Sequence, residues 1–320
     1  MTMRAPNPTQ PARILSALRA AALALAPLAC VALPGQACEV RAVADVPIDT
    51  STPNLIVHVS VDGTPLPFVL DTGAQRTVLD AATVQRLGVA RDEWAATTMR
   101  GVGGDDQQRN AKPASVVLGG VMLRPRSLAP FLSLPVATLP HGLVGGVPVA
   151  GLLGSDLLSS FDLIIDGPGR RLALNEVRDC SGGFLPWKVP YEALPTMRPL
   201  ENLLLIPVQI DGHVLMAELD SGAAYTTVLA PGMAKLGITQ ADIARDRPLQ
   251  ARGLGPNAVM MHFHRFATMS VGSRVQANPV LLVGPARALR IVDMLLGADW
   301  LRPRLVWVSY ATSRVFVAEP

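Results

Sequence analysis

The sequence lacks the motifs of several hydrolase classes. It contains no G-x-S-x-G run and no H-E-x-x-H run, and beyond its first 37 residues it has no cysteine and histidine arrangement of a nucleophilic pair. The first two runs position a serine nucleophile and a catalytic zinc ion, so their absence argues against those hydrolases. His262 and His264 share a strand face, but nothing completes a metal site around them. We expect no metal and no other cofactor.

The sequence has an excess of basic residues only in its first 37 residues. Arg4, Arg13 and Arg19 precede an uncharged apolar stretch, residues 20–33, and small residues follow it. This order is typical of a secretory signal peptide, and the stretch is too short for a comfortable membrane span. The rest of the chain has 25 basic and 25 acidic residues, which gives no electrostatic reason to expect a nucleic-acid partner. We expect a periplasmic or secreted protein with no stable membrane span after signal removal.

Cysteine is scarce, with three residues in the whole chain. Cys30 lies in the predicted signal, which leaves Cys38 and Cys180 as an even pair in an exported protein. We expect these two to form a disulfide. The alternative is a lipoprotein in which Cys38 is acylated, but Gly35 stands where such sites usually carry leucine.

The sequence does contain an internal repeat. Asp71–Ala74 (DTGA) returns 149 residues later as Asp220–Ala223 (DSGA), and strand-like residues precede each run. Further along, Leu152–Asp156 matches Leu295–Asp299 at an offset of 143 residues. Matches this widely spread indicate a duplicated unit. We expect each aspartate to lie at the end of a strand and to point into a turn.

The repeated motifs resemble those of a known family. The run DTGAQRTVL at 71–79 resembles the catalytic turn of retropepsins, and LLGSDLL at 152–158 resembles their hydrophobic-Gly turn and following helix. Nearly all of residues 54–318 is thus similar to two units of the pepsin/retropepsin-like aspartic proteases. The resemblance implies an all-β, bilobal pepsin-like fold of two related closed-barrel-like β lobes with short helices. The expected divisions are a signal peptide at 1–37, an N-terminal lobe at 38–180, an inter-lobe crossover at 181–202 and a C-terminal lobe at 203–320.

Two aspartates from two related lobes can meet between the lobes. Carboxylates about 3 Å apart cannot both ionise, and aspartic proteases are the general example of such a pair. We expect Asp71 and Asp220 to share one proton and to activate a water molecule that attacks a peptide bond. Both halves of the site are in one chain, so we expect a monomer. The residues expected to support this pair are Thr72, Gly73, Ser221 and Gly222.

Glycine-rich runs predict a hairpin tip in each half. Gly101–Gly104 lies between the two motifs of the first half, and Gly253–Pro256 is its counterpart. By resemblance these hairpins are flaps that close over an extended polypeptide substrate. A noncatalytic peptide-binding or inhibitor-like pseudoprotease of the same fold is the alternative to an aspartic endopeptidase. The residues expected to bind substrate are Ala74, Gln75, Val102, Gly103, Ala223, Ala224 and Leu254.

Overall fold

The computed structural model describes most of the chain after the predicted signal peptide. The described residues are 39–125, 132–140, 142–178, 185, 187–200, 202–286 and 291–318. The predicted signal peptide and both cysteines of the predicted disulfide, Cys38 and Cys180, lie outside them. No helix in the described part of the chain has the length and hydrophobicity needed to span a membrane.

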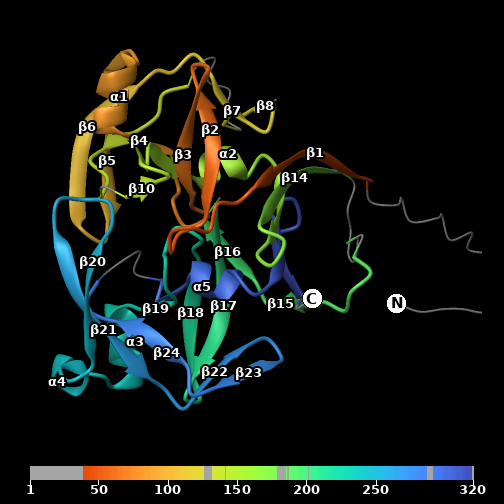
Figure 1. Cartoon of the computed structure of the whole chain (residues 1–320). Coiled ribbons are helices and arrows are strands. Elements are labelled where there is room, and N and C mark those ends of the chain that lie inside the picture. Colours follow the sequence, from red (N-terminus) through yellow and green to blue (C-terminus); the bar gives the residue numbers. More distant parts are fainter. Residues whose placement is uncertain are drawn as a thin grey trace, which may run out of the picture. The chain divides into compact units, whose positions relative to one another are not determined.

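The first half of the chain is built on a seven-stranded sheet (Figure 1). Asp62 and Gly63 both have positive φ, and they form the tight turn between β2 and β3. Strand β3 runs parallel to β12, and β12 is antiparallel to β4, so the end of β3 lies in the middle of the sheet. In sheet order the strands are β8 (Val121–Met122), β7 (Val116–Leu118), β2 (Ile56–Val61), β3 (Thr64–Leu70), β12 (Gly151–Leu153), β4 (Val78–Asp80) and β9 (Val136–Ala137).

The second half repeats this arrangement in a ten-stranded sheet. Asp211 and Gly212 form the corresponding turn with positive φ, and β18 runs parallel to β25, which is antiparallel to β19. In sheet order the strands are β20 (Arg247–Arg252), β21 (Ala258–Arg265), β24 (Val280–Val283), β19 (Thr227–Val228), β25 (Met294–Leu296), β18 (His213–Leu219), β17 (Leu203–Ile210), β22 (Thr268–Val271) and β23 (Arg274–Ala277), with β16 (Met197–Leu200) beside β17.

A six-stranded sheet joins the two halves. Its centre is the antiparallel pairing of β13 from the first half with β26 from the second. Across this junction the indole N–H of Trp307 donates to Asp162, and the main hydrophobic core continues from one lobe to the other. The described residues of both lobes therefore form one compact unit. In sheet order the strands are β1 (Glu39–Pro47), β14 (Arg171–Arg178), β13 (Asp162–Asp166), β26 (Leu305–Ser309), β27 (Arg314–Ala318) and β15 (Glu192–Leu194).

In the described part of the chain, helices are few and short. The sequence predicts a helix that begins after Asp80 and ends before Gly88, and α1 confirms it: the Asp80 side chain accepts from the Thr83 N–H, and Gly88 is left-handed. The helices are α1 (Ala81–Leu87), α2 (Ser155–Leu158), α3 (Ala230–Leu236), α4 (Gln240–Ile243) and α5 (Ala298–Leu301). Two hairpins form two-stranded sheets of their own. They are β5 (Arg91–Gly101) with β6 (Gly104–Ala111), and β10 (Leu143–Val144) with β11 (Val147–Pro148).

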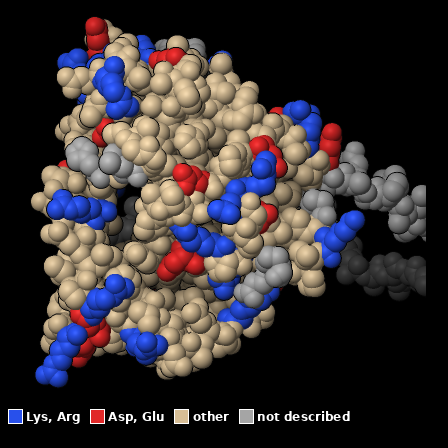
Figure 2. Space-filling model, in the orientation of Figure 1, with Lys and Arg blue, Asp and Glu red and all other residues tan. Residues whose placement is uncertain are grey.

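The expected fold class is confirmed by these elements. The described chain is mostly strand, with two lobes built from matching arrangements and a few short helices. On the face shown in Figure 2, basic and acidic side chains are interspersed over both lobes. The part of the fold that bears on function is the junction of the lobes, where β3 and β18 both end.

Candidate active site

The two repeated aspartates follow corresponding strands. Asp71 comes directly after β3 and Asp220 directly after β18. The backbone N–H of Asp71 donates to the carbonyl of Leu153 at 3.0 Å, and that of Asp220 donates to the carbonyl of Leu296 at 3.0 Å. Each aspartate thus lies at the end of a strand, as the repeat predicts, and is fixed there by the parallel strand beside its own.

The two carboxyl groups meet between the lobes. Each one lies directly over the glycine of the other lobe's loop: a Cβ added to Gly73 would be 2.6 Å from Cγ of Asp220, and one added to Gly222 would be 2.3 Å from Cγ of Asp71. At this separation each carboxyl group shifts the pKa of the other. Only glycine leaves room for this approach.

Backbone amides stabilise both carboxyl groups. Oδ1 of Asp71 accepts from the N–H of Ala74 at 2.7 Å. Oδ1 of Asp220 accepts from the N–H of Gly222 at 2.9 Å and from that of Ala223 at 3.0 Å. These bonds fix the carboxyl planes and leave the facing oxygens to interact with each other.

Burial sets the protonation of the pair. It raises the pKa of Asp71 well above the usual aspartate value, and the charge of Asp220 raises that pKa further. Burial also raises the pKa of Asp220, against the lowering effect of its amide hydrogen bonds. Since the two groups titrate together, the pair retains one proton to a higher pH than two separate carboxyl groups would. Such a pair has one proton donor and one proton acceptor side by side.

Thr72 and Ser221 lock the two loops together in a reciprocal way. The N–H of Thr72 donates to Oγ of Ser221 at 3.0 Å, and the N–H of Ser221 donates to Oγ1 of Thr72 at 3.1 Å. Each hydroxyl then donates across the junction, Thr72 to the carbonyl of Leu219 at 2.6 Å and Ser221 to the carbonyl of Leu70 at 2.7 Å. Both side chains are buried. The four bonds fix the ends of β3 and β18 relative to each other.

Further supporting contacts were not predicted from the sequence. Asp156 accepts from both the N–H and the hydroxyl of Thr77 at 2.7 Å, and Asp299 makes the same two contacts with Thr226 at 2.7 Å. The sequence did point to these two acids, because each one ends a copy of the repeated Leu-Leu-Gly motif. Asn54 had no such signal, yet its amide donates to the carbonyl of Gly222 at 2.7 Å.

The two glycine-rich hairpin tips contact each other. The tip between β5 and β6 approaches the tip between β20 and β21 along one edge of the structure (Figure 1). The N–H of Gly103 donates to the carbonyl of Leu254 at 2.9 Å, and the N–H of Asn257 donates to the carbonyl of Gly103 at 3.0 Å. The tips are therefore closed against one another.

The apolar tip residues cross over to the opposite lobe. Leu254, from the second half, is buried in a cluster with Val78, Ala137 and Leu139 of the first half. Conversely, Val102 packs against a cluster of the second half that contains Leu205, Leu282 and Leu295. The two clusters form apolar walls beneath the tips.

The other residues expected to bind substrate are placed as follows. Ala74 and Ala223 lie in the aspartate loops, and Ala223 also packs against the second-half cluster. Ala224 is half-buried, whereas Gln75 is exposed. The structure thus places Ala74 and Ala223 next to the aspartates, packs Val102 and Ala223 against the same apolar cluster, and leaves Gln75 at the surface.

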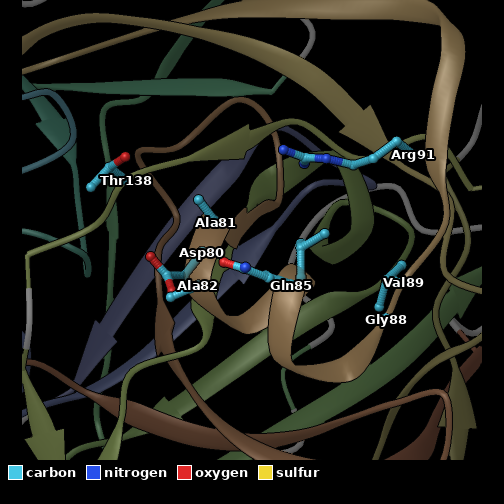
Figure 3. A pocket seen from close by; sticks show the side chains of 9 residues that line it. Asp80, Ala81, Ala82, Gln85, Gly88, Val89, Arg91 and Thr138 are labelled. Atoms are coloured by element: carbon cyan, nitrogen blue, oxygen red, sulfur yellow. The ribbon is translucent and has the colours of Figure 1, made fainter.

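No group of three or more metal-binding side chains is formed by the described residues. Nδ1 of His264 lies 2.6 Å from the carboxylate of Asp246, so this histidine has a structural partner. A hollow of about 610 Å³ lies beside α1, lined by Gln85, Arg91 and Thr138 among others (Figure 3). Its one carboxylate, that of Asp80, already accepts from two backbone amides, which makes the hollow a surface depression rather than a second site.

Comparisons with known proteins agree with this geometry. A profile of the family described as aspartyl protease matches residues 57–157 and 206–300, two ranges that each contain one of the aspartates. The crystal structure of an aspartic proteinase from Irpex lacteus is similar in fold, with a TM-score of 0.50 and 13% sequence identity over 86% of this chain and 97% of that chain. No curated protein matches the sequence.

Proposed function

We propose that this chain, which belongs to the aspartyl protease family, is an aspartic endopeptidase that hydrolyses peptide bonds of extended polypeptides. The observation that carries the proposal is the meeting of two buried carboxyl groups, Asp71 and Asp220, across a reciprocal hydrogen-bond frame. An exported location, in the periplasm or outside the cell, is part of the proposal and rests on residues 1–37.

The chemistry follows from one proton on the pair. The ionised carboxylate takes a proton from a water molecule between the two groups, and the water oxygen attacks the carbonyl carbon of the peptide bond. The protonated carboxyl group donates its proton to the carbonyl oxygen. The group that took the water proton then gives it to the amide nitrogen, while the other carboxylate takes a hydroxyl proton from the tetrahedral diol. The C–N bond breaks without a covalent enzyme intermediate, and the pair again holds one proton. Burial supports this division of tasks, because the hydrogen bond through which the two groups share a proton is stronger in surroundings of low dielectric.

The frame around the pair contributes positioning. Proton transfer needs the water, the two carboxyl groups and the peptide carbonyl within hydrogen-bond reach of one another. The Thr72–Ser221 bonds tie the loops to each other, while the Thr77–Asp156 and Thr226–Asp299 contacts tie each loop to its own lobe. The carboxyl groups therefore need no rearrangement when substrate binds.

Substrate binding requires the hairpin tips to part. A polypeptide placed between them as an extended strand would replace the tip-to-tip bonds of Gly103 with bonds to its own backbone. It would also displace Leu254 and Val102 from the apolar walls, which would then receive substrate side chains. A peptide-binding pseudoprotease could use the same walls, so the test must detect hydrolysis.

Hydrolysis can be tested directly. The purified chain without residues 1–37 is incubated with a denatured protein, with and without a statine-type inhibitor that places a hydroxyl group between the two carboxyl groups. We expect fragments that disappear when the inhibitor is present. Inhibitor binding without any fragment formation would instead support the noncatalytic alternative.

The chain is predicted to act as a monomer, because Asp71 and Asp220 are supplied by the same polypeptide. Specific activity on a peptide substrate should stay constant on dilution from micromolar to nanomolar concentrations. Sedimentation at the same concentrations measures the mass independently. A steep loss of specific activity together with a falling mass would show that the active species is an obligate dimer.

Activity is predicted to be highest in mildly acidic to neutral solution, roughly at pH 5 to 7. Burial raises the pKa of Asp71 and Asp220, so the state with one proton on the pair persists as the pH rises. Ala74 and Ala223 have no hydroxyl that could donate to the ionised carboxylate and oppose this effect. A serine at position 74 would supply one, which favours the charged form and lowers the pKa.

The Ala74→Ser variant should accordingly shift the pH–rate profile toward acid, as measured on a single peptide substrate. Ala82→Ser places the same hydroxyl on the exposed surface of α1 and should leave the profile unchanged. A maximum near pH 2 to 3 in the unmodified protein, or an identical profile for Ala74→Ser, contradicts the prediction.

A further inference from the structure

A third carboxyl group lies next to the pair and takes no part in the proposed reaction. Glu218 is on β18, two residues before Asp220. Along this strand Leu215, Ala217 and Leu219 face the main core, and Met216 faces the second-half cluster. Because strand side chains alternate, Glu218 lies on the same face as Met216, toward the wall beneath the hairpin tips.

The surroundings of Glu218 are apolar. Its register partners are Leu205 on β17 and Leu295 on β25, and both belong to the second-half cluster against which Val102 and Ala223 pack. Glu218 as a whole residue is only 7% exposed. The carboxyl group therefore stands in the apolar wall itself.

No partner compensates this buried acid. Among the described residues none donates a hydrogen bond to its carboxyl group or forms an ion pair with it. Burial, followed by the charges of Asp220 and Asp71, raises the pKa of Glu218 well above the usual glutamate value. An unpaired buried carboxyl group destabilises a fold, so an apolar residue would serve stability better at this position.

The first lobe has such an apolar residue at the matching place. Val69 precedes Asp71 as Glu218 precedes Asp220, and it is buried with Ile56, Val144 and Leu152 in an apolar cluster. The two matching positions beside the pair therefore differ in one property. The first lobe has a valine there, among apolar neighbours, whereas the second lobe has an acid among leucines.

We propose that Glu218 is a specificity-determining residue, which receives a lysine or arginine side chain of the substrate on the second-lobe side of the cleaved bond. The inference rests on the proposed function and names the substrate class for that site. A lysine or arginine fits both features of the wall, because its aliphatic stem packs on Leu205 and Leu295 while its charged end favours the ionised form of Glu218 and pairs with that carboxylate. The cation also lies near the single negative charge of the Asp71–Asp220 pair, which strengthens the attraction in apolar surroundings.

The proposal is tested with two peptide series on the chain that lacks residues 1–37. One series varies the residue before the cleaved bond and the other varies the residue after it, through lysine, arginine, norleucine and glutamine. Norleucine keeps the apolar stem of lysine without its charge. At one of the two positions we expect kcat/KM for lysine and arginine to exceed that for norleucine by about 10-fold or more.

Two variants and one control assign this preference to the side chain. Glu218→Gln keeps the size and removes the charge, and it should abolish the preference. Glu218→Val copies the first-lobe residue, and it should reverse the preference toward norleucine while raising the midpoint of thermal unfolding at neutral pH. Glu39→Gln removes an exposed charge at the start of β1 and should keep the unmodified preference. Equal preferences in the unmodified protein and Glu218→Gln would overturn the proposal.

Binding separates this inference from the proposed function. Hydroxyethylene peptides have the central bond replaced by a group that cannot be hydrolysed, and their Kd values can be measured without catalysis. If lysine analogues bind more tightly than norleucine analogues, and only with Glu218 present, the inference stands even in a protein that cleaves nothing. If apolar peptides are cleaved but neither Kd nor kcat/KM depends on Glu218, the proposed function stands and the inference fails.

Discussion

Replacing either Asp71 or Asp220 by asparagine is expected to lower kcat/KM on a peptide substrate by a factor of at least about 10² to 10⁴. An amide can neither take a proton from water nor give one to the peptide carbonyl, and the remaining carboxyl group cannot perform both tasks at once. The two variants should be about equally impaired, because the groups act as one unit. A matched control is Asp45→Asn, which removes only an exposed ion pair with Arg171 and should retain full activity.

The fold of both variants should remain intact. The pKa of Asp71 and of Asp220 is raised in the folded protein above the reference value of 3.8, so their contribution to stability is present below that value and is lost as the pH rises through the folded-state pKa. An asparagine does not ionise. At neutral pH the variants should therefore unfold at a temperature no lower than the unmodified protein. Near-full activity in Asp220→Asn would disprove the assignment of the catalytic pair.

Much of the site could be predicted because it is repeated. A run such as DTG is a polar turn in many proteins, but two copies at corresponding places require two corresponding strand ends. The ends of β3 and β18 are those places. Local rules were sufficient for α1 as well, because a capping aspartate and a left-handed glycine act within a few residues of the helix ends.

Long-range pairing could not be predicted in the same way. The short apolar runs in β13 and β26 indicate buried strands, but nothing in either run says that the two strands pair with each other across the lobes. The residues expected to cross between the lobes, 181–202, also contribute β15 to the six-stranded sheet and β16 to the second-half sheet. The register of such edges depends on neighbours that are far away in sequence.

Two features of the site needed side-chain positions. Val102 and Leu254 were expected near substrate because they are apolar residues at hairpin tips, but their packing against opposite lobes follows from the contact of the two tips. Glu218 lies in a run whose neighbours predict a buried strand, and the sequence offers no partner for it. Its significance becomes visible only when its burial and its strand neighbours, Leu205 and Leu295, are known.

Adding one methyl group at Gly222 is expected to be nearly as damaging as removing a carboxyl group. The Cβ of Gly222→Ala would lie 2.3 Å from Cγ and 2.5 Å from Oδ2 of Asp71, far inside van der Waals contact. Asp71 belongs to a loop held by hydrogen bonds that the N–H groups of Ala74 and Ser221 donate to it, so the methyl group cannot be accommodated without moving the carboxyl pair. A displacement of about 1 Å lowers the rate by about 10²-fold, and the overpacking costs about 1–3 kcal/mol of folding free energy.

Gly142→Ala is the matched control for this substitution. The added Cβ at position 142 would meet its nearest neighbour, a methyl group of Val149, at 3.7 Å, which is ordinary contact. Neither glycine has the left-handed backbone that strains an alanine, so the contrast between the two variants is the space for the methyl group. We expect Gly142→Ala to match the unmodified protein in kcat/KM and unfolding temperature. For Gly222→Ala we expect both values to be lower. Full activity in Gly222→Ala would contradict this prediction. It would mean that the two lobes lie further apart than the close contacts of Gly73 and Gly222 with the opposite aspartates indicate. The two carboxyl groups would then be too far apart to share a proton.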